Sequence, residues 1–234
     1  MARLIAALIR HGDYRQLART PSALQPFPLN EAGRAQAKKG VAELIELLQE
    51  GGYKLHPQLD SSRLLRAWQT AQIFSEELRV VSAATLQVSS FDDLAERSVG
   101  SAANLTIQQI EAVLREDPRF CEPPADWKSN SHYCLPLQGA ESLMQAGVRV
   151  AEHLETSMQM LADQCRVDTA KVFVGHGAAI RHAAHQLGVL KFEQIARLSM
   201  YHCRPVLLER QQQGKWRHVA GDWKVRGQSE AFTD

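Results

Sequence analysis

Two short apolar runs, each ending in a histidine that precedes a glycine, constrain the fold of this chain most. Residues 4–9 (LIAALI) lead directly into Arg-His-Gly at 10–12, and residues 172–175 (VFVG) lead into His-Gly at 176–177. Runs of this kind are typical of buried strands in a parallel sheet. Parallel strands end at the same edge of a sheet, and α/β proteins place their active sites there. If the two strands run parallel, both histidines lie together at that edge.

An arginine, a histidine and a glycine at one strand end suit phosphoryl chemistry. Arg10 can bind an anion with its planar fork of donors, and His11 can act as a nucleophile. Gly12 allows the backbone to approach a ligand closely. A histidine at a strand end is also compatible with a purely structural role, so the rest of the chain has to decide between the two interpretations.

Charge and composition exclude several classes of protein. The 234 residues include 27 basic and 26 acidic side chains, a net charge of +1. This balance favours neither nucleic acid nor an anionic membrane as a partner, and no apolar stretch approaches the roughly 20 residues that span a bilayer. The N-terminus has no signal-peptide pattern, and the four cysteines form no C-x-x-C pair. We therefore expect a cytoplasmic protein with reduced thiols, although two disulfide bonds are also compatible with the count.

Helical patterns alternate with short apolar strands along the chain, which favours an α/β fold. We predict a three-layer α/β/α sandwich with a mostly parallel central sheet, built as a single domain over residues 1–234. The predicted elements of the first part are strand 4–9, helix 30–48, strand end 59–62 and helix 66–78, and helix 30–48 is capped by Asn30 and stopped at Gly51 and Gly52. A capping box of Thr106 and Gln109 opens the next helix. The last predicted elements are helix 141–165, strand 171–175, helix 177–187 and an edge hairpin of 204–210 and 216–220 around Gly214.

An insertion is expected at about residues 98–140. Its second half, residues 118–139, contains four prolines and has no clear periodicity. A connection of this length is unusual in a compact domain unless it forms a lid or a binding loop. The alternative is a surface loop without a function.

A further strand-to-helix junction, at residues 62–71, carries Arg63 and Arg66. Arg66 falls in the first turn of the predicted helix, where the helix dipole disfavours a cation. That position is reasonable if a phosphate neutralises the charge. Arg63 either flanks the same site or is solvated.

Five motifs in this order resemble the histidine phosphatase superfamily, which includes the cofactor-dependent phosphoglycerate mutases. The motifs are Leu8-Ile9-Arg10-His11-Gly12, Ser62 with Arg66-Ala67-x-Gln69-Thr70-Ala71, Leu94-Ala95-Glu96-Arg97 with Gly100, Gly139-Ala140-Glu141-Ser142 and Val174-Gly175-His176-Gly177. The resemblance spans about residues 4–190. It implies a phosphoglycerate mutase-like sandwich and a phosphohistidine site.

The resemblance and the chemistry together give the catalytic and substrate-binding roles. His11 would attack phosphorus and form a covalent phosphohistidine, with one ring nitrogen unprotonated and the other donating to a backbone carbonyl. Arg10 and Arg66 would bind the equatorial oxygens of the phosphoryl group. His176 would add a donor on the opposite side, and Gly177 begins a helix whose free N–H groups can bind an anion.

Glu96 matches the family's general-acid position. It would protonate the leaving group and later deprotonate the attacking water. From the residues alone, the segment 92–97 also reads as a solvated acidic turn in which Glu96 pairs with Arg97.

We expect no metal and no other cofactor. His176, His182 and His185 suggest a metal site, and the last two share a helix face. No nearby carboxylate or cysteine completes a zinc ligand set, however, and His176 fits the phosphate site better.

The residues around the core separate mutases from phosphatases. The segment Gly100–Thr106 has no following lysine, and no Arg-Arg pair precedes Pro123, which departs from the mutase pattern. The Arg-His-Gly-x-Tyr start and the segment 197–200 are more similar to mutase-like phosphatases, some of which act on phosphoproteins. We predict a metal-independent phosphomonoester hydrolase of the histidine acid type, acting on a small phosphorylated metabolite or a phosphoprotein. The alternatives are a phosphoglycerate mutase and a non-catalytic phosphate-binding or scaffold protein, and the oligomeric state stays open, with a homodimer among the options.

Overall fold

The computed structural model describes residues 2–21, 24–82 and 84–227, so residue 1, residues 22–23 of the first loop, residue 83 and residues 228–234 of the predicted domain lie outside it. Within these ranges the central sheet contains β1 (Leu4–Arg10), β2 (Lys54–Leu55), β3 (Gln58–Ser62), β4 (Gln87–Phe91), β5 (Thr169–Gly175), β7 (Pro205–Arg210) and β8 (Trp216–Ala220). The strand order is β4-β3-β5-β1-β7-β8, with β2 paired to β5. Strands β1 to β5 run parallel, and β7 and β8 add an antiparallel hairpin at one edge. The predicted mostly parallel sheet and its edge hairpin are confirmed.

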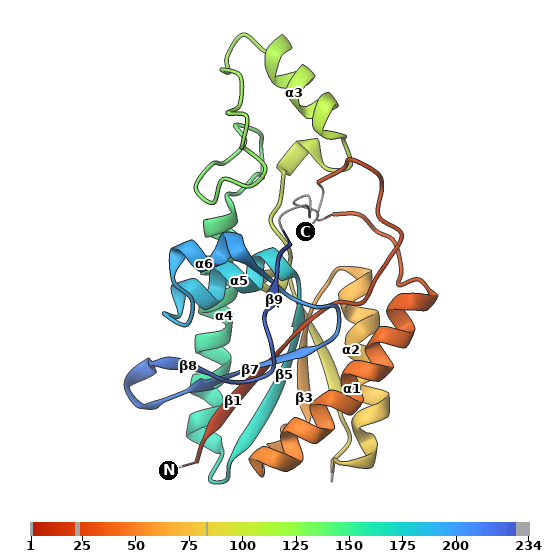
Figure 1. Ribbon diagram of the computed structural model, residues 1–234, viewed down its shortest axis with the longest axis vertical. Helices are drawn as coiled ribbons and strands as arrows, with labels where there is room; N and C mark the ends of the chain where they lie inside the picture. The colour runs from red at the N-terminus through yellow and green to blue at the C-terminus, as the bar shows by residue number, and fades with distance from the viewer. Residues whose placement is uncertain (1, 22–23, 83, 228–234) are drawn as a thin grey trace.

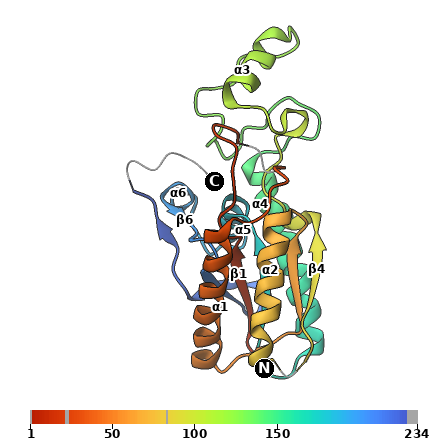
Figure 2. The same ribbon diagram turned by 90° about the vertical axis from the view of Figure 1, so that its right-hand side faces the viewer.

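Helices cover both faces of this sheet, as Figures 1 and 2 show. One face carries α1 (Glu31–Gly51) and α2 (Leu65–Glu77), and the other carries α4 (Leu143–Gln164) and α5 (Gly177–Gln186). Strand β1 divides its side chains between the two layers. Its odd-numbered residues from Ile5 to Ile9 pack with α1 and α2, while its even-numbered residues from Leu4 to Leu8 pack with α4 and α5. The predicted three-layer sandwich is therefore confirmed, and β1 is apolar from Leu4 to Ile9 because both of its faces are buried.

Capping residues set the helix starts that the sequence predicted. Asn30 caps α1, with its side-chain oxygen accepting from the Gly33 N–H at 2.7 Å. Thr106 opens α3 (Ile107–Glu116) with the predicted capping box. Helix α4 begins two residues later than position 141, because Ser142 is its N-cap and its hydroxyl accepts a backbone hydrogen bond.

Several short elements were not predicted. Strand β4 is an edge strand with two serines and no fully buried residue, so it lacks an apolar run. Helix α6 (Phe192–Arg197) has only six residues, too few to show a helical period. The pair β6 (Leu198–Ser199) and β9 (Lys224–Val225) joins segments far apart in the chain. Such elements depend on tertiary contacts more than on local pattern.

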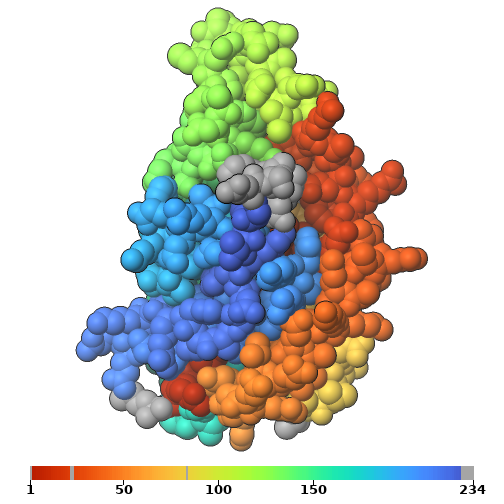
Figure 3. All heavy atoms as spheres, viewed as in Figure 1, coloured from red at the N-terminus to blue at the C-terminus, as the bar shows by residue number. Residues whose placement is uncertain are grey.

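The insertion projects from the body beyond the edge at which β1 and β5 end (Figures 1 and 3). An antiparallel bridge between Val99 and Ala140 closes its base. It has a small core of its own, formed by Val99, Ala102, Ile110, Leu114, Trp127 and Leu135. The single-domain assignment and the insertion boundaries of about 98–140 stay predictions. Movement of the insertion as a lid stays a prediction.

The helices and the cysteines of the described residues bear on the expected location and redox state. In the part of the chain that the structure describes, no helix combines the length and the apolar character needed to cross a bilayer. All four cysteines are free thiols, and Cys203 is the buried one. The alternative with two disulfide bonds therefore does not describe this structure.

Candidate active site

The parallel pairing of β1 with β5 brings the two predicted histidines together. Arg10 lies opposite Gly175 in the strand register, and the His11 N–H donates to the Gly175 carbonyl at 3.0 Å. The ring centroids of His11 and His176 are consequently 4.9 Å apart. The sequence prediction that both lie at one sheet edge is confirmed.

The His11 ring is buried and held in one tautomer. Its Nδ1 lies 2.8 Å from the Gly12 carbonyl, which can only accept, so Nδ1 carries the hydrogen. Its Nε2 therefore has the lone pair and accepts from the Arg66 Nε–H at 3.2 Å. Burial, followed by the nearby Arg66, lowers the pKa of His11 well below its ordinary value. His11 is thus neutral at neutral pH, with the lone pair of Nε2 directed at Arg66.

Arg66 connects both histidines to the first loop. Besides His11, it donates from Nη1 to the Gln25 carbonyl at 3.1 Å and from Nη2 to His176 Nδ1 at 3.2 Å. The Tyr14 ring lies 4.5 Å from its guanidinium carbon. As predicted, Arg66 is in the first turn of α2, and only 2% of it is exposed. A buried cation at this end of a helix is unfavourable unless an anion joins it.

His176 has partners at both ring nitrogens. Because its Nδ1 accepts from Arg66, its Nε2 carries the hydrogen and donates to the Ser62 hydroxyl at 3.0 Å. Burial, and then the charge of Arg66, lowers the pKa of His176 well below its ordinary value. In this arrangement the ring offers no further donor, so the predicted donation to a phosphoryl group requires a rearrangement or a second proton. That role stays a prediction.

Glu96 caps α5 instead of lying in a solvated turn. One of its oxygens accepts from the Ala178 N–H at 3.1 Å, and the other from the N–H groups of Ala179 at 2.9 Å and Arg97 at 3.0 Å. The helix dipole and the free N–H groups of the first turn favour an acceptor here. The hydrogen bond of the Glu96 carboxylate is to the Arg97 backbone, while its charge also favours the charged form of the buried Arg97 guanidinium.

The two glycines of the strand-end motifs pack closely against protein atoms. A Cβ on Gly177 would lie 3.2 Å from the Arg10 side chain. A Cβ on Gly12 would lie 2.5 Å from the Gly33 carbonyl oxygen of α1. The close approach expected of Gly12 is therefore to the backbone of α1 and not to a ligand.

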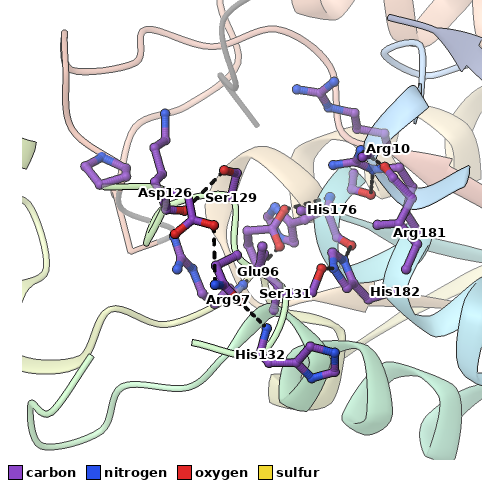
Figure 4. A pocket seen from close by; sticks show the side chains of 18 of the residues that line it. Arg10, Glu96, Arg97, Asp126, Ser129, Ser131, His132, His176, Arg181 and His182 are labelled. Atoms are coloured by element: carbon purple, nitrogen blue, oxygen red, sulfur yellow. Dashed lines mark hydrogen bonds between the residues drawn. The ribbon is translucent and has the colours of Figure 1, made fainter. Parts of the chain in front are cut away.

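All six predicted site residues line one cavity of about 460 Å³. They are Arg10, His11, Arg66, Glu96, His176 and Gly177. Figure 4 shows side chains from the insertion meeting this group, among them Asp126 and His132. The rest of the wall comes from the first loop, including Tyr14, from the start of α4, and from α5 and α6, including Arg181 and Phe192.

Sequence reasoning missed several lining residues. Tyr14 is one of them, and the Arg-His-Gly-x-Tyr start is the sequence signal that includes it. Arg97 is 6% exposed, and no described residue accepts a hydrogen bond from its guanidinium, which lies 5.7 Å from the Trp127 ring. The insertion segment 126–132 shows no periodicity, so no local pattern indicates that it reaches the cavity.

The remaining candidates have structural partners. His182 donates from Nδ1 to the Ala178 carbonyl at 2.7 Å and contacts the Ser131 hydroxyl through Nε2 at 3.0 Å. His185 Nδ1 lies 3.0 Å from the Leu190 carbonyl. The described residues contain no cluster of three histidine, cysteine or acidic side chains arranged to hold a metal ion. Arg63 is exposed and lies 3.5 Å from Asp92, outside the cavity wall.

The burial of His182 makes the stability of the fold depend on pH. Burial lowers the pKa of His182 from 6.5 to about 4, so the unfolded chain binds one more proton between these values. The contribution of neutral His182 to the free energy of unfolding is therefore complete above pH 6.5 and is lost as the pH falls toward about 4. We expect His182→Asn to weaken this dependence by about 2 kcal/mol at about pH 4.5 relative to pH 7, measured by urea unfolding. Identical pH dependence in both proteins would contradict this origin.

Comparisons with known proteins agree with the fold. The fold is similar to that of a mycobacterial glucosyl-3-phosphoglycerate phosphatase, with 22% identity, coverage of 96% of this chain and 100% of that chain, and a TM-score of 0.65. It is also similar to the alpha-ribazole phosphatase from Shigella flexneri, with 18% identity, coverage of 95% and 98%, and a TM-score of 0.65. The search of curated proteins gives no match. The model of the histidine phosphatase superfamily (branch 1) matches residues 6–222. The chain therefore belongs to the histidine phosphatase superfamily.

Proposed function

We propose that this protein is a phosphomonoester hydrolase that acts through a covalent phosphohistidine on His11. The observation that carries the proposal is the state of the His11 ring, with Nδ1 bound to the Gly12 carbonyl and the Nε2 lone pair directed at Arg66 in the cavity. A neutral, oriented imidazole is ready to act as a nucleophile. Membership of the histidine phosphatase superfamily supports the same chemistry.

The reaction has two balanced steps. In the first, the Nε2 lone pair of His11 forms a bond to phosphorus, the bond to the ester oxygen breaks, and that oxygen takes a proton from Glu96. In the second, a water molecule attacks phosphorus and gives a proton to Glu96. The P–N bond then breaks, and its electron pair returns to His11 as phosphate leaves.

Arg66 and Arg10 stabilise the charge that spreads over the equatorial oxygens in each step. The Arg66 donors contact His11 and His176 in the structure. An incoming phosphoryl group replaces those neutral acceptors with charged oxygens, which form stronger hydrogen bonds. The dianion also favours a proton on His176, which turns that ring into the donor that the sequence predicts.

Glu96 is placed to serve as acid and base. It lines the cavity with His11, and its two oxygens differ in their partners, since one accepts two N–H groups and the other accepts one. The less engaged oxygen is the better position for the transferable proton. The first step needs Glu96 protonated and the second needs it ionised, so one carboxyl group serves both steps.

A small phosphorylated molecule suits the cavity better than a phosphoprotein. A volume of about 460 Å³ lies in the range of small-molecule sites. The cationic side chains in its wall are Arg10, Arg66, Arg97, Lys128 and Arg181, against the carboxylates of Glu96 and Asp126. This local excess of positive charge favours an anionic substrate, although the whole chain has a net charge of only +1. Two proteins of similar fold are phosphatases named for small phosphorylated molecules.

Replacement of His11 tests the nucleophile. We expect His11→Ala to lower turnover of p-nitrophenyl phosphate by about 10⁴-fold or more, because no other group forms the covalent intermediate. The assay measures phosphate release with excess chelator, which should leave the wild-type rate unchanged. His185→Gln is a matched control outside the cavity wall, and its rate should stay within about twofold of wild type. Full activity of His11→Ala, or loss of wild-type activity with chelator, would refute the mechanism.

A second assay separates a phosphatase from a mutase. With 3-phosphoglycerate and its bisphosphorylated primer, we expect release of phosphate without isomerisation, because the lysine and paired arginines of the mutase pattern are missing. Product analysis by NMR distinguishes the two outcomes. Efficient isomerisation with little phosphate release would make the protein a mutase. Absence of both, with phosphate binding retained, would favour a non-catalytic binding protein.

A further inference from the structure

The segment that carries Glu96 is held from outside the cavity by one arginine of α4. Nη1 of Arg149 donates to the carbonyls of Asp93 at 2.7 Å, Ala95 at 3.1 Å and Asp92 at 3.3 Å. Three carbonyl dipoles pointing at one place repel each other unless a cation lies among them. Arg149 therefore stabilises the turn that immediately precedes Glu96.

Glu141 completes this contact from the other side. Its Oε1 accepts from Nη2 of Arg149 and also from the Ser98 N–H at 3.0 Å, two residues after Glu96. Its own N–H donates to the Ser98 carbonyl at 3.0 Å. We call Arg149 and Glu141 the clamp. It contacts the backbone on both sides of Glu96.

The clamp lies outside the cavity, although the charge of Arg149, after burial and the nearer arginines, adds to the lowering of the His176 pKa. Neither member lines the cavity, and their side chains are 23% and 20% exposed. Glu96 itself is otherwise fixed by the N–H groups at the start of α5 and by that of Arg97. These contacts hold the end of the side chain, whereas the clamp holds the backbone from which that side chain extends.

We propose that Arg149 and Glu141 are positioning residues that set the location of Glu96 for proton transfer. This inference rests on the proposed role of Glu96 as general acid. Loss of the clamp displaces the carboxyl group from the ester oxygen while leaving His11, Arg10 and Arg66 in place. Small displacements of a reacting group reduce rates strongly, so proton transfer suffers before phosphoryl binding does.

Leaving groups of different basicity distinguish this role from a general structural one. An alkyl alkoxide needs a proton as it departs, whereas a dinitrophenolate departs without one. We expect Arg149→Met to lower kcat/KM for an alkyl phosphate by about 10–100-fold and for 2,4-dinitrophenyl phosphate by less than about threefold. Glu96→Gln should show the same selectivity with a larger loss. Glu141→Gln should show it with a smaller one, since the amide oxygen still accepts from Ser98.

A second ion pair of α4 provides the matched control. Arg210 Nε lies 3.0 Å from Glu155 at the opposite end of the sheet, where Arg210 pairs with Leu4. Arg210→Gln should leave both kcat/KM values unchanged. Circular dichroism establishes folding, and Glu141→Gln serves in place of Arg149→Met if the latter does not fold.

The outcomes separate the clamp from the proposed mechanism. Selective loss in Glu96→Gln and in a folded clamp variant supports the inference. Selective loss in Glu96→Gln, with an unselective loss or no loss in the clamp variants, overturns the clamp and leaves the mechanism intact. An unselective effect of Glu96→Gln removes the general-acid role, and the clamp's proposed purpose with it.

Discussion

The parallel pairing of β1 with β5 is the constraint on which the rest of the site depends. It places Arg10 opposite Gly175, so His11 and His176 leave the sheet side by side. Both strands are buried on two faces, and their register pairs each residue from Leu4 to Arg10 with a residue of β5. The position of the proposed nucleophile therefore follows from the pairing of two core strands.

Arg66 turns this geometry into a site with defined protonation states. It donates to His11 and to His176, and its charge, after burial, helps to lower the pKa of each ring. The two imidazoles beside the buried Arg66 are neutral, and Glu96 is a nearby carboxylate that favours the charged form of Arg66. The phosphoryl group of the proposed mechanism would add an anion next to Arg66, which fits an arginine in the first turn of α2.

Much of this arrangement follows from local sequence, and the exceptions have physical causes. The apolar runs before His11 and His176 predict the central strands because strands buried on both faces need no polar alternation. Arg66 is predictable because its position opposes the helix dipole. The partners of Glu96 are not predictable, since the N–H groups of Ala178 and Ala179 come from a helix about eighty residues further along the chain. The insertion wall around Ser131 likewise depends on a contact with His182 that no periodicity indicates.

In the proposed mechanism the Nε2 atom of His11 attacks phosphorus. Rapid acid-free quenching of the enzyme during turnover, followed by ³¹P NMR and peptide mapping, identifies both the phosphorylated residue and the ring nitrogen. The structure predicts phosphate on Nε2 of His11, because Nδ1 is engaged with the Gly12 carbonyl. Phosphate on Nδ1 of that ring, or on any other residue, would contradict the account.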